Sequence, residues 1–325
     1  MDAMDILLLG GTAFLGREIA RQLVAQGDAV TCLARGSHPA PGGTTWVQAD
    51  RDDPDALAGV SQQAWDAIVD LTSEPVHAIR AAGQLTARHW VYISSGSVYA
   101  DFSTPKQQVT AQTVPPLNQE RMQDPSQYGP AKVACENAYL ALNQPVTIIR
   151  PGLIGGDGDW TGRSGYYPWR FAHPTGPDVL VPDPTQPTAI LDVQDLAAWI
   201  THCIHERVSG IFNAAGSSTT LEDVYQQCKD LTGSQAIIRA VEDQQLLAEG
   251  IQPWMGPRSL PLWIPEPSLR FVAILDCGPA RAKGFQTRPL TQTLAAALQY
   301  EERRDDPRQA GLTDDDEEAL RRALG

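Results

Sequence analysis

Short apolar runs alternate with amphipathic stretches through the first 150 residues of the chain. Six runs of four or five residues predict strands at Ile6–Leu9, Ala29–Leu33, Trp46–Ala49, Ala67–Leu71, Trp90–Ser94 and Val146–Ile149. Between them, apolar residues recur at helical spacing over Phe14–Gln26, Val76–Leu85 and Ala131–Leu142. Because strands that alternate with helices in this way form βαβ units, the pattern predicts a parallel sheet.

The chain changes character after residue 150. Pro, Gly and Trp are crowded from there to Pro187, which indicates a long irregular segment of the kind that shapes a site at strand ends. A strand-like run at Ala189–Leu191, a helix over Asp195–His205 and another strand-like run at residues 210–216 follow. These later elements predict that the chain returns to complete the sheet.

Composition and charge narrow the class of partner. The 325 residues are 42% apolar and 20% charged, which is typical of a globular protein, and the formal net charge is −14. That charge repels phosphate backbones and anionic headgroups, so neither nucleic acid nor a membrane is an expected partner. Five scattered cysteines without CxxC spacing, and an N-terminus with no basic leader region, indicate reduced thiols and a cytoplasmic protein.

A glycine-rich turn follows the first predicted strand and precedes the first predicted helix. Gly10 and Gly11 tolerate backbone angles that side chains forbid and allow a pyrophosphate to approach peptide N–H groups. Gly16 allows helix and strand to pack closely, and Thr12 is a candidate cap for the helix. In this strand–turn–helix context the glycines predict a dinucleotide site, and a purely structural turn is the alternative.

The turn and the strand–helix alternation together predict the fold class. We expect an α/β fold with a Rossmann doubly wound parallel sheet and a smaller C-terminal substrate lobe. Residues 1–150 and about 188–216 are expected to form the dinucleotide-binding Rossmann domain. Residues from about 151–187 and 217–325 are expected to form the substrate-binding lobe.

The end of the second predicted strand bears on which nicotinamide cofactor binds. NAD-selective sites hold an acidic residue there for the ribose hydroxyls, whereas an arginine suits a 2′-phosphate. In this chain Ala34 occupies the place of the acid, Arg35 follows it, and Ser37 lies two residues further on. Charge-assisted hydrogen bonds from Arg35 make NADP(H) the preferred cofactor. NAD(H) is the alternative if Arg35 is only a solvent-facing loop residue.

Tyr128 and Lys132 have the YxxxK spacing, which places both side chains on one face of a helix. A tyrosine exchanges a proton with a substrate oxygen near neutral pH only if its phenolate is stabilised, and a nearby ammonium group does this. The chain has only four lysines, and this one lies near the start of a helix that leads into the Arg150-Pro151-Gly152 run. The pair is therefore a candidate catalytic centre.

These motifs resemble those of the extended short-chain dehydrogenases/reductases, the NAD-dependent epimerase/dehydratase family. The resemblance rests on the glycine turn, the YxxxK pair, RPG at 150–152, LDVQDLA at 191–197 and FNAAG at 212–216. The chain departs from the family at Ala13, where the GxxGxxG turn has its middle glycine. The resemblance implies a Rossmann core with a C-terminal substrate lobe, and hydride exchange at a carbinol carbon.

The resemblance also assigns further site residues. The family's catalytic Ser or Thr lies three residues before a Val-Tyr pair, which selects Ser95 ahead of Val98 and Tyr99 and gives it the role of polarising the reacting carbonyl. Asp50 matches a family position that contacts the adenine edge, with a plain turn aspartate as the equal alternative. The other cofactor contacts expected around the turn and the strand ends are Thr12, Phe14, Leu15, Arg51 and Leu71. Tyr128 and Lys132 are also expected to contact the cofactor, with Lys132 holding the nicotinamide ribose.

Several activities are known in such a family, and the sequence separates some of them. Nucleotide-sugar 4,6-dehydratases carry an Asp-Glu pair directly after the Ser/Thr, and Gly96-Ser97 stand there in this chain, so dehydration is rejected. An NADPH-dependent carbonyl reductase is preferred because of Arg35, and the expected substrate is a small-molecule carbonyl compound, an alcohol or a sugar nucleotide. The alternatives are a nucleotide-sugar epimerase with bound NAD and a cofactor-sensing binding protein without turnover. Because the family often pairs helices near the YxxxK segment, a homodimer is one expected assembly.

Other polar and aromatic residues have ordinary structural explanations beside functional ones. Four arginines are weak candidates for binding a substrate anion, namely Arg163, Arg170, Arg258 and Arg270. At least half of a set of aromatic residues are expected to pack the lobe instead of lining a pocket: Trp160, Tyr166, Tyr167, Trp169, Trp254 and Trp263. Asp192 and Asp195 are interpreted as structural residues at a helix start, and His202 and His205 lack an accompanying carboxylate cluster, so no metal is expected.

Overall fold

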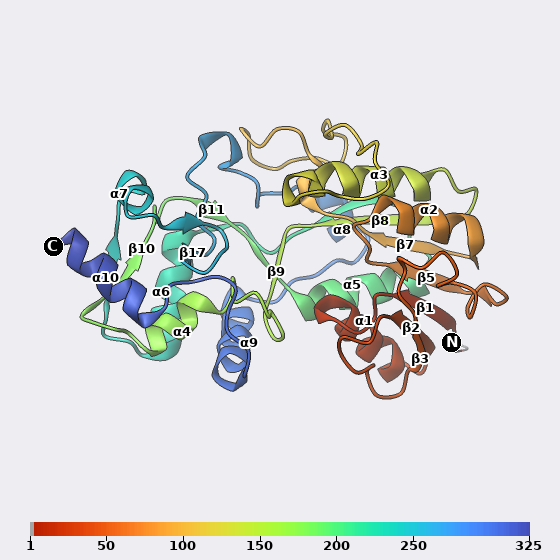
Figure 1. Cartoon of the computed structure of the whole chain (residues 1–325), viewed down its shortest axis with the longest axis horizontal. Coiled ribbons are helices and arrows are strands. Elements are labelled where there is room, and N and C mark those ends of the chain that lie inside the picture. Colours follow the sequence, from red (N-terminus) through yellow and green to blue (C-terminus); the bar gives the residue numbers. More distant parts are fainter. Residues whose placement is uncertain (1–2) are drawn as a thin grey trace.

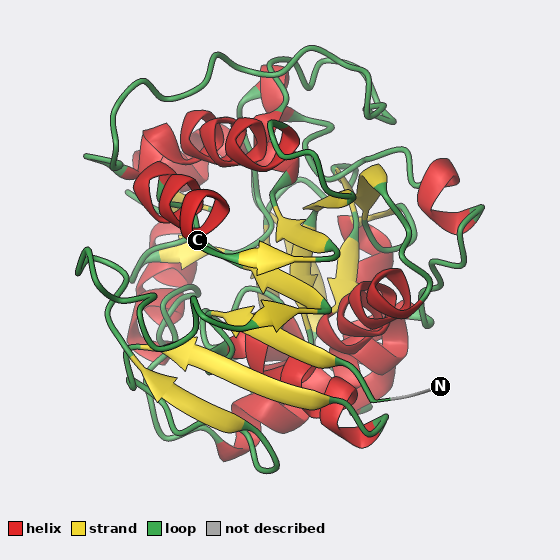
Figure 2. Ribbon diagram, turned by 90° about the vertical axis from the view of Figure 1, so that its right-hand side faces the viewer, coloured by secondary structure: helices red, strands yellow, loops and turns green. Residues whose placement is uncertain are grey.

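A seven-stranded parallel sheet forms the centre of the N-terminal lobe in the computed structural model, which describes residues 3–325. The strand order is β13-β8-β7-β5-β1-β2-β3, and every pairing is parallel. The strands are β1 (Asp5–Leu9), β2 (Ala29–Ala34), β3 (Thr45–Gln48), β5 (Ala67–Asp70), β7 (Trp90–Ile93), β8 (Val146–Pro151) and β13 (Gly210–Ala214). The predicted Rossmann sheet is therefore confirmed, and Figure 2 shows its strands from the side of the N-terminal lobe.

Helices cover both faces of this sheet (Figure 1). On one face α1 (Phe14–Ala25) packs against α5 (Val193–His205), and on the other α2 (Pro75–Gln84) packs against α3 (Tyr128–Leu140). The pleat of β1 explains the two cores, because Ile6 and Leu8 point toward the first pair of helices and Leu7 and Leu9 toward the second. A strand buried on both faces needs a continuous apolar run, which is what β1 provides.

The predicted elements of this lobe are confirmed with boundaries shifted by one to three residues. The largest shift is at α3, which begins at Tyr128 instead of Ala131, so the whole YxxxK motif is helical. The run at residues 210–216 completes the sheet as β13, paired with β8. The run at 189–191 lies outside the central sheet, because β12 (Ile190–Asp192) pairs only with β9 (Leu153–Gly155).

A second hydrophobic core lies in the C-terminal lobe, on the left in Figure 1. Its main elements are α4 (Tyr166–Ala172), α6 (Leu221–Thr232), α9 (Leu290–Arg303), α10 (Asp314–Leu324), and the parallel pair β10 (Asp178–Val181) and β15 (Ile237–Ala240). Tyr166, Tyr167 and Trp263 are buried in this core, as expected of at least half of the aromatic set. Trp160 is exposed, and Trp169 and Trp254 are partly buried.

The remaining helices and strands are two to six residues long. They are β4 (Ala64–Trp65), β6 (Thr86–Ala87), β11 (Pro187–Thr188), β14 (Thr219–Thr220), β16 (Gln252–Pro253), β17 (Ser259–Leu260), α7 (Asp243–Ala248) and α8 (Gly278–Arg281). Apolar residues between Phe271 and Phe285 pack against the core of the N-terminal lobe, although the sequence assigned 217–325 to the substrate lobe. Over residues 3–325, no helix has the length and apolar character that crossing a bilayer requires.

Candidate cofactor and catalytic site

The glycine turn between β1 and α1 has the geometry of a phosphate cradle. Gly10 has a φ of +102°, which side chains rarely adopt, and a Cβ on Gly16 would collide with the carbonyl oxygen of Gly10. Helix α1 begins after Ala13 without a side-chain cap and without an acidic residue in its first turn. Its first N–H groups and the positive end of its dipole thus remain available to an anion, so these residues fit the diphosphate of a dinucleotide.

The structure gives Thr12 and Gly11 of this turn other roles than those expected from sequence. Thr12 was a candidate helix cap, but Ala13 occupies the N-cap position and Thr12 is buried. A Cβ on Gly11 would meet the Cys32 thiol at 2.6 Å, so Gly11 is required by the packing of the turn against β2. Phe14 and Leu15 form the start of α1, and Leu71 lies 3.6 Å from the Cβ position of Gly10, where it forms the floor of the cradle.

Substitution of Gly16 by alanine is expected to reduce nicotinamide dinucleotide affinity by about tenfold or more, because the new methyl group pushes α1 away from the turn. Calorimetric titration of the purified variant with NADPH and NADH measures the loss. Gly83→Ala on α2 is the matched control, since nothing lies within 4 Å of its Cβ position. Equal affinity of Gly16→Ala and the parent protein would show that the turn does not contact the cofactor.

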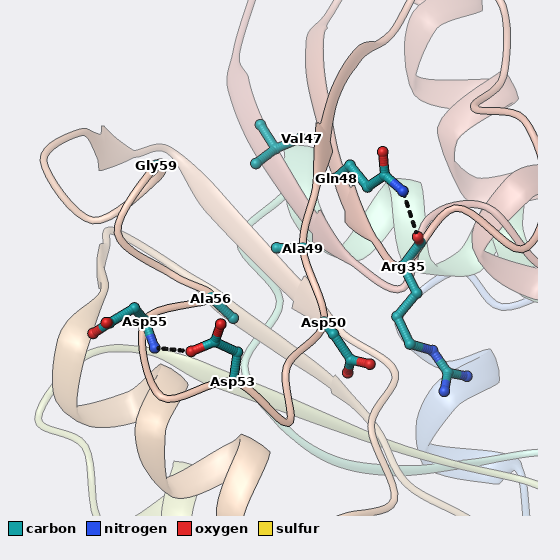
Figure 3. A pocket seen from close by; sticks show the side chains of 9 residues that line it. All are labelled: Arg35, Val47, Gln48, Ala49, Asp50, Asp53, Asp55, Ala56 and Gly59. Atoms are coloured by element: carbon teal, nitrogen blue, oxygen red, sulfur yellow. Dashed lines mark hydrogen bonds between the residues drawn. The ribbon is translucent and has the colours of Figure 1, made fainter.

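Arg35 and Asp50 line the same open hollow beyond the end of β2 (Figure 3). The hollow has a volume of about 550 Å³, and its other lining residues are Val47, Gln48, Ala49, Asp53, Asp55, Ala56 and Gly59. Gln48 donates a hydrogen bond to the carbonyl of Arg35 at 3.0 Å, which fixes the backbone there. Within the described chain the Arg35 guanidinium has no carboxylate partner, and Ser37 beside it is exposed. Asp50 accepts from Asp52 N–H at 3.1 Å, as a turn aspartate does.

Arg51 was expected at the cofactor, but its guanidinium points into the protein. It makes a bidentate ion pair with Asp70, with distances of 2.7 and 2.8 Å, and it also donates to the carbonyl of His77. Burial disfavours the charge on Asp70, but the charge of Arg51 and hydrogen bonds from Arg51 and Tyr139 outweigh it and lower the pKa of Asp70. The Arg51 guanidinium is therefore bound to Asp70 and His77, and only the backbone of Arg51 remains for contact with a cofactor.

Tyr128 and Lys132 lie together at the N-terminal end of α3. The Tyr128 side chain is 38% exposed, so a substrate can reach it. The Lys132 Nζ lies 5.8 Å from the centre of the Tyr128 ring and donates to the carbonyls of Thr72 and Ile93 at 2.8 and 2.7 Å. Ile93 ends β7 and Thr72 lies two residues after the end of β5, so two of the three ammonium protons hold the lysine in place and the third is left for the site.

Ser95 follows β7 and lies at the start of a 3₁₀ turn over Gly96–Val98. Its Oγ accepts from Ser97 N–H at 3.1 Å and lies 3.1 Å from Ser97 Oγ. Gly129, directly after Tyr128, allows α3 to approach this turn, because a Cβ there would collide with the carbonyl oxygen of Ser97. The sequence motif contained this glycine, but only the packing of α3 on the turn explains it.

A buried ion pair beneath this centre was missed by reasoning from sequence. Arg150 forms two hydrogen bonds with Glu136, at 2.9 and 2.7 Å, and Ser94 donates to Glu136 at 2.5 Å. Glu136 lies one helical turn after Lys132, so its position on the same face of α3 was the available signal. The network joins α3 to the ends of β7 and β8 and thereby holds Lys132 beneath the site.

The remaining polar candidates have structural partners. Asp192 caps α5 by accepting from Gln194 N–H at 2.8 Å, and Asp195 binds the backbone and guanidinium of Arg288. His205 contacts Asp28, and residues 3–325 contain no group of three or more His, Cys, Asp or Glu side chains placed to hold one metal ion. All five cysteines are buried and free.

Comparison with known proteins agrees with the fold. Residues 6–80 match the model of the NAD dependent epimerase/dehydratase family. No curated protein matches the chain. The enzyme WbmG of Bordetella bronchiseptica, solved with NAD and UDP, is 16% identical with a TM-score of 0.68, over 93% of this chain and 96% of that one. A UDP-glucose-4-epimerase from Stenotrophomonas maltophila, solved with NAD and formylated UDP-arabinopyranose, is 20% identical with a TM-score of 0.67, over 92% and 98%.

A third similar structure is a putative epimerase from Burkholderia cenocepacia J2315. It is 20% identical with a TM-score of 0.67, and the match covers 91% of this chain and 97% of the other. At these identities the likeness establishes the fold, which extends through both lobes.

Proposed function

From the match of residues 6–80 to the NAD dependent epimerase/dehydratase family, a family of enzymes, we propose that the chain is an NADPH-dependent carbonyl reductase. Its proposed catalytic centre is Ser95, Tyr128 and Lys132. The recognition of the family from its motifs is confirmed. The observation that carries the reductase proposal is Arg35, which follows β2 where NAD-selective sites hold an acid and which has no carboxylate partner in residues 3–325. NADPH usually serves as a reductant that the reaction consumes, which favours a reductase.

Each member of the centre has a distinct part in the proposed reduction. When bound, NADPH supplies the hydride to the carbonyl carbon. Ser95 Oγ donates a hydrogen bond to the carbonyl oxygen, and Tyr128 transfers its phenolic proton to that oxygen as the alcohol forms. Lys132 stabilises the phenolate that remains, because its ammonium is fixed near the ring by the carbonyls of Thr72 and Ile93. A proton from solvent then restores Tyr128.

Replacement of Arg35 by alanine is expected to weaken NADPH binding by about tenfold to a hundredfold and to leave NADH binding nearly unchanged, because only NADPH carries the 2′-phosphate. Parallel titrations of the parent and variant proteins with both cofactors measure the ratio. Arg281→Ala, at another exposed arginine, is the control for loss of one positive charge. An unchanged ratio of NADPH to NADH affinity would remove the basis for the reductase assignment.

A nucleotide-sugar epimerase with bound NAD is the second candidate. It is favoured by the similar structures solved with NAD, which include a UDP-glucose-4-epimerase. An epimerase oxidises and reduces its substrate in turn, so it converts substrate without net consumption of NADPH. A reductase consumes one NADPH for each carbonyl reduced, and preferential NADH binding by the parent protein would move the epimerase to first place.

A further inference from the structure

The structure separates the four arginines that the sequence offered as anion-binding candidates. Arg170 is fully buried and pairs with Glu317 and Asp314. Arg258 pairs with Asp316, and Arg270 pairs with Asp183. Across the described residues, Arg163 alone among the four has no carboxylate within ion-pairing distance. Its charge is therefore the one that the protein itself does not neutralise.

Hydrogen bonds within the protein fix the turn that carries Arg163. Asp159 accepts from the backbone and hydroxyl groups of both Thr161 and Ser164. Thr161 Oγ1, fixed in this way, accepts from the Nε of Arg163 at 3.1 Å. The inner edge of the guanidinium is thus held, while its two terminal nitrogens donate to no protein acceptor over residues 3–325. That outer edge has the fork that binds a planar anion through two hydrogen bonds.

The surroundings of Arg163 connect the two lobes. Its guanidinium lies 5.0 Å from the centre of the Trp254 ring, which belongs to the C-terminal lobe. On the other side, Gly158 of the same turn approaches the Phe14 ring of the cofactor cradle, with a Cβ position 3.3 Å away. The turn of Arg163 thus contacts the C-terminal lobe on one side and the start of α1 on the other, and burial lowers the pKa of Arg163 while the charge of Asp159 acts in the opposite direction.

We propose that Arg163, held by Thr161 and bounded by Trp254, binds an acidic group of the substrate close to the carbon that reacts at Tyr128. The inference rests on the proposed function, because it takes Tyr128 as the reacting centre. The ligand chemistry is a carboxylate or a phosphate, and the substrate class is a carbonyl compound, or the matching alcohol, that carries this acid. A partly buried guanidinium with no carboxylate within ion-pairing distance gains most from such a ligand, because part of its desolvation cost has already been met on folding and the acid supplies the missing counter-charge.

The test compares acidic aldehyde probes with their neutral esters. 3-Carboxybenzaldehyde and 4-carboxybenzaldehyde, their methyl esters and 4-formylphenyl phosphate are titrated calorimetrically into the full-length protein saturated with NADP⁺, which cannot reduce them. At least one acidic probe is expected to bind about tenfold or more tightly than its ester. Preference for the carboxylates or for the phosphate identifies which acid the site takes. The preference is expected to vanish in Arg163→Gln and to survive in part in Arg163→Lys, which keeps the charge without the fork.

Arg281→Gln is the matched control and is expected to keep the full preference for the acid. A merely structural role for Arg163 would weaken the acids and the esters alike, so the ratio between them isolates contact with the anion. Equal or absent binding of all probes by the parent protein, or a preference that persists in Arg163→Gln, overturns the proposal. NADP⁺ binding is measured beforehand, and if it is absent the probes are titrated into the cofactor-free protein, so failure of the cofactor assignment and failure of the anion site give different results.

Discussion

Tyr128→Phe is expected to reduce carbonyl reduction by about a thousandfold while NADPH binds with its parental affinity, because the phenolic proton is lost and the ring is retained. The NADPH oxidation rate with the best aldehyde found in the binding experiments measures turnover. Tyr128 lies at the start of α3, where its side chain is 38% exposed, so removal of one hydroxyl group there leaves the core intact. The loss is thus expected in kcat, with the thermal unfolding midpoint nearly unchanged.

Tyr300→Phe on α9 is the control for loss of a tyrosine hydroxyl elsewhere in the chain, and parental turnover is expected of it. Parental turnover of Tyr128→Phe itself would show that another group supplies the proton. Loss of NADPH affinity in Tyr128→Phe would instead assign the tyrosine to cofactor binding, against the role that we propose.

Glu136→Gln is expected to lower the free energy of unfolding by about 3–5 kcal/mol, because it leaves the Arg150 guanidinium buried without its counter-charge. Glu136 and Arg150 are 2% and 4% exposed, so water cannot replace the lost partner. In the parent protein, burial disfavours the charged guanidinium, but the hydrogen bond and charge of Glu136 and a hydrogen bond with Tyr99 raise the pKa of Arg150. The variant lacks the charge of Glu136, but an arginine side chain stays protonated in proteins, so a buried charge is left without its partner. Chemical denaturation followed by circular dichroism measures the change.

Glu18→Gln is the matched control, because Glu18 pairs with Arg21, whose side chain is 59% exposed. Exposed pairs of this kind contribute about 0–1 kcal/mol, so the control should unfold almost as the parent protein does. Similar destabilisation of both variants would mean that the buried ion pair of Glu136 contributes no more to stability than the exposed pair of Glu18. A stable Glu136→Gln protein with reduced turnover would assign this residue mainly to holding Lys132 in position.

The glycine turn and the YxxxK pair could be found from sequence because their spacing is local. Gly10, Gly16, Tyr128 and Lys132 each act within one turn or one helix, and the periodicity of the chain already specifies those elements. The strands could be predicted from sequence for the same reason, since a sheet covered on both faces requires continuous apolar runs such as that of β1.

Which carboxylate pairs with each arginine depends on segments that are far apart in the chain. Arg51 resembled a cofactor contact until β5 placed Asp70 against it, and Arg170 resembled Arg163 until α10 brought Glu317 to it. Periodicity reports which face of an element is buried, but it does not report which distant partner meets a charge there. The sequence by itself thus determined the sheet, the glycine turn and the YxxxK pair at the start of its helix. Only the tertiary structure decided which of the four candidate arginines are paired with carboxylates and that Arg163 is not, because ion pairing is set by distances between elements.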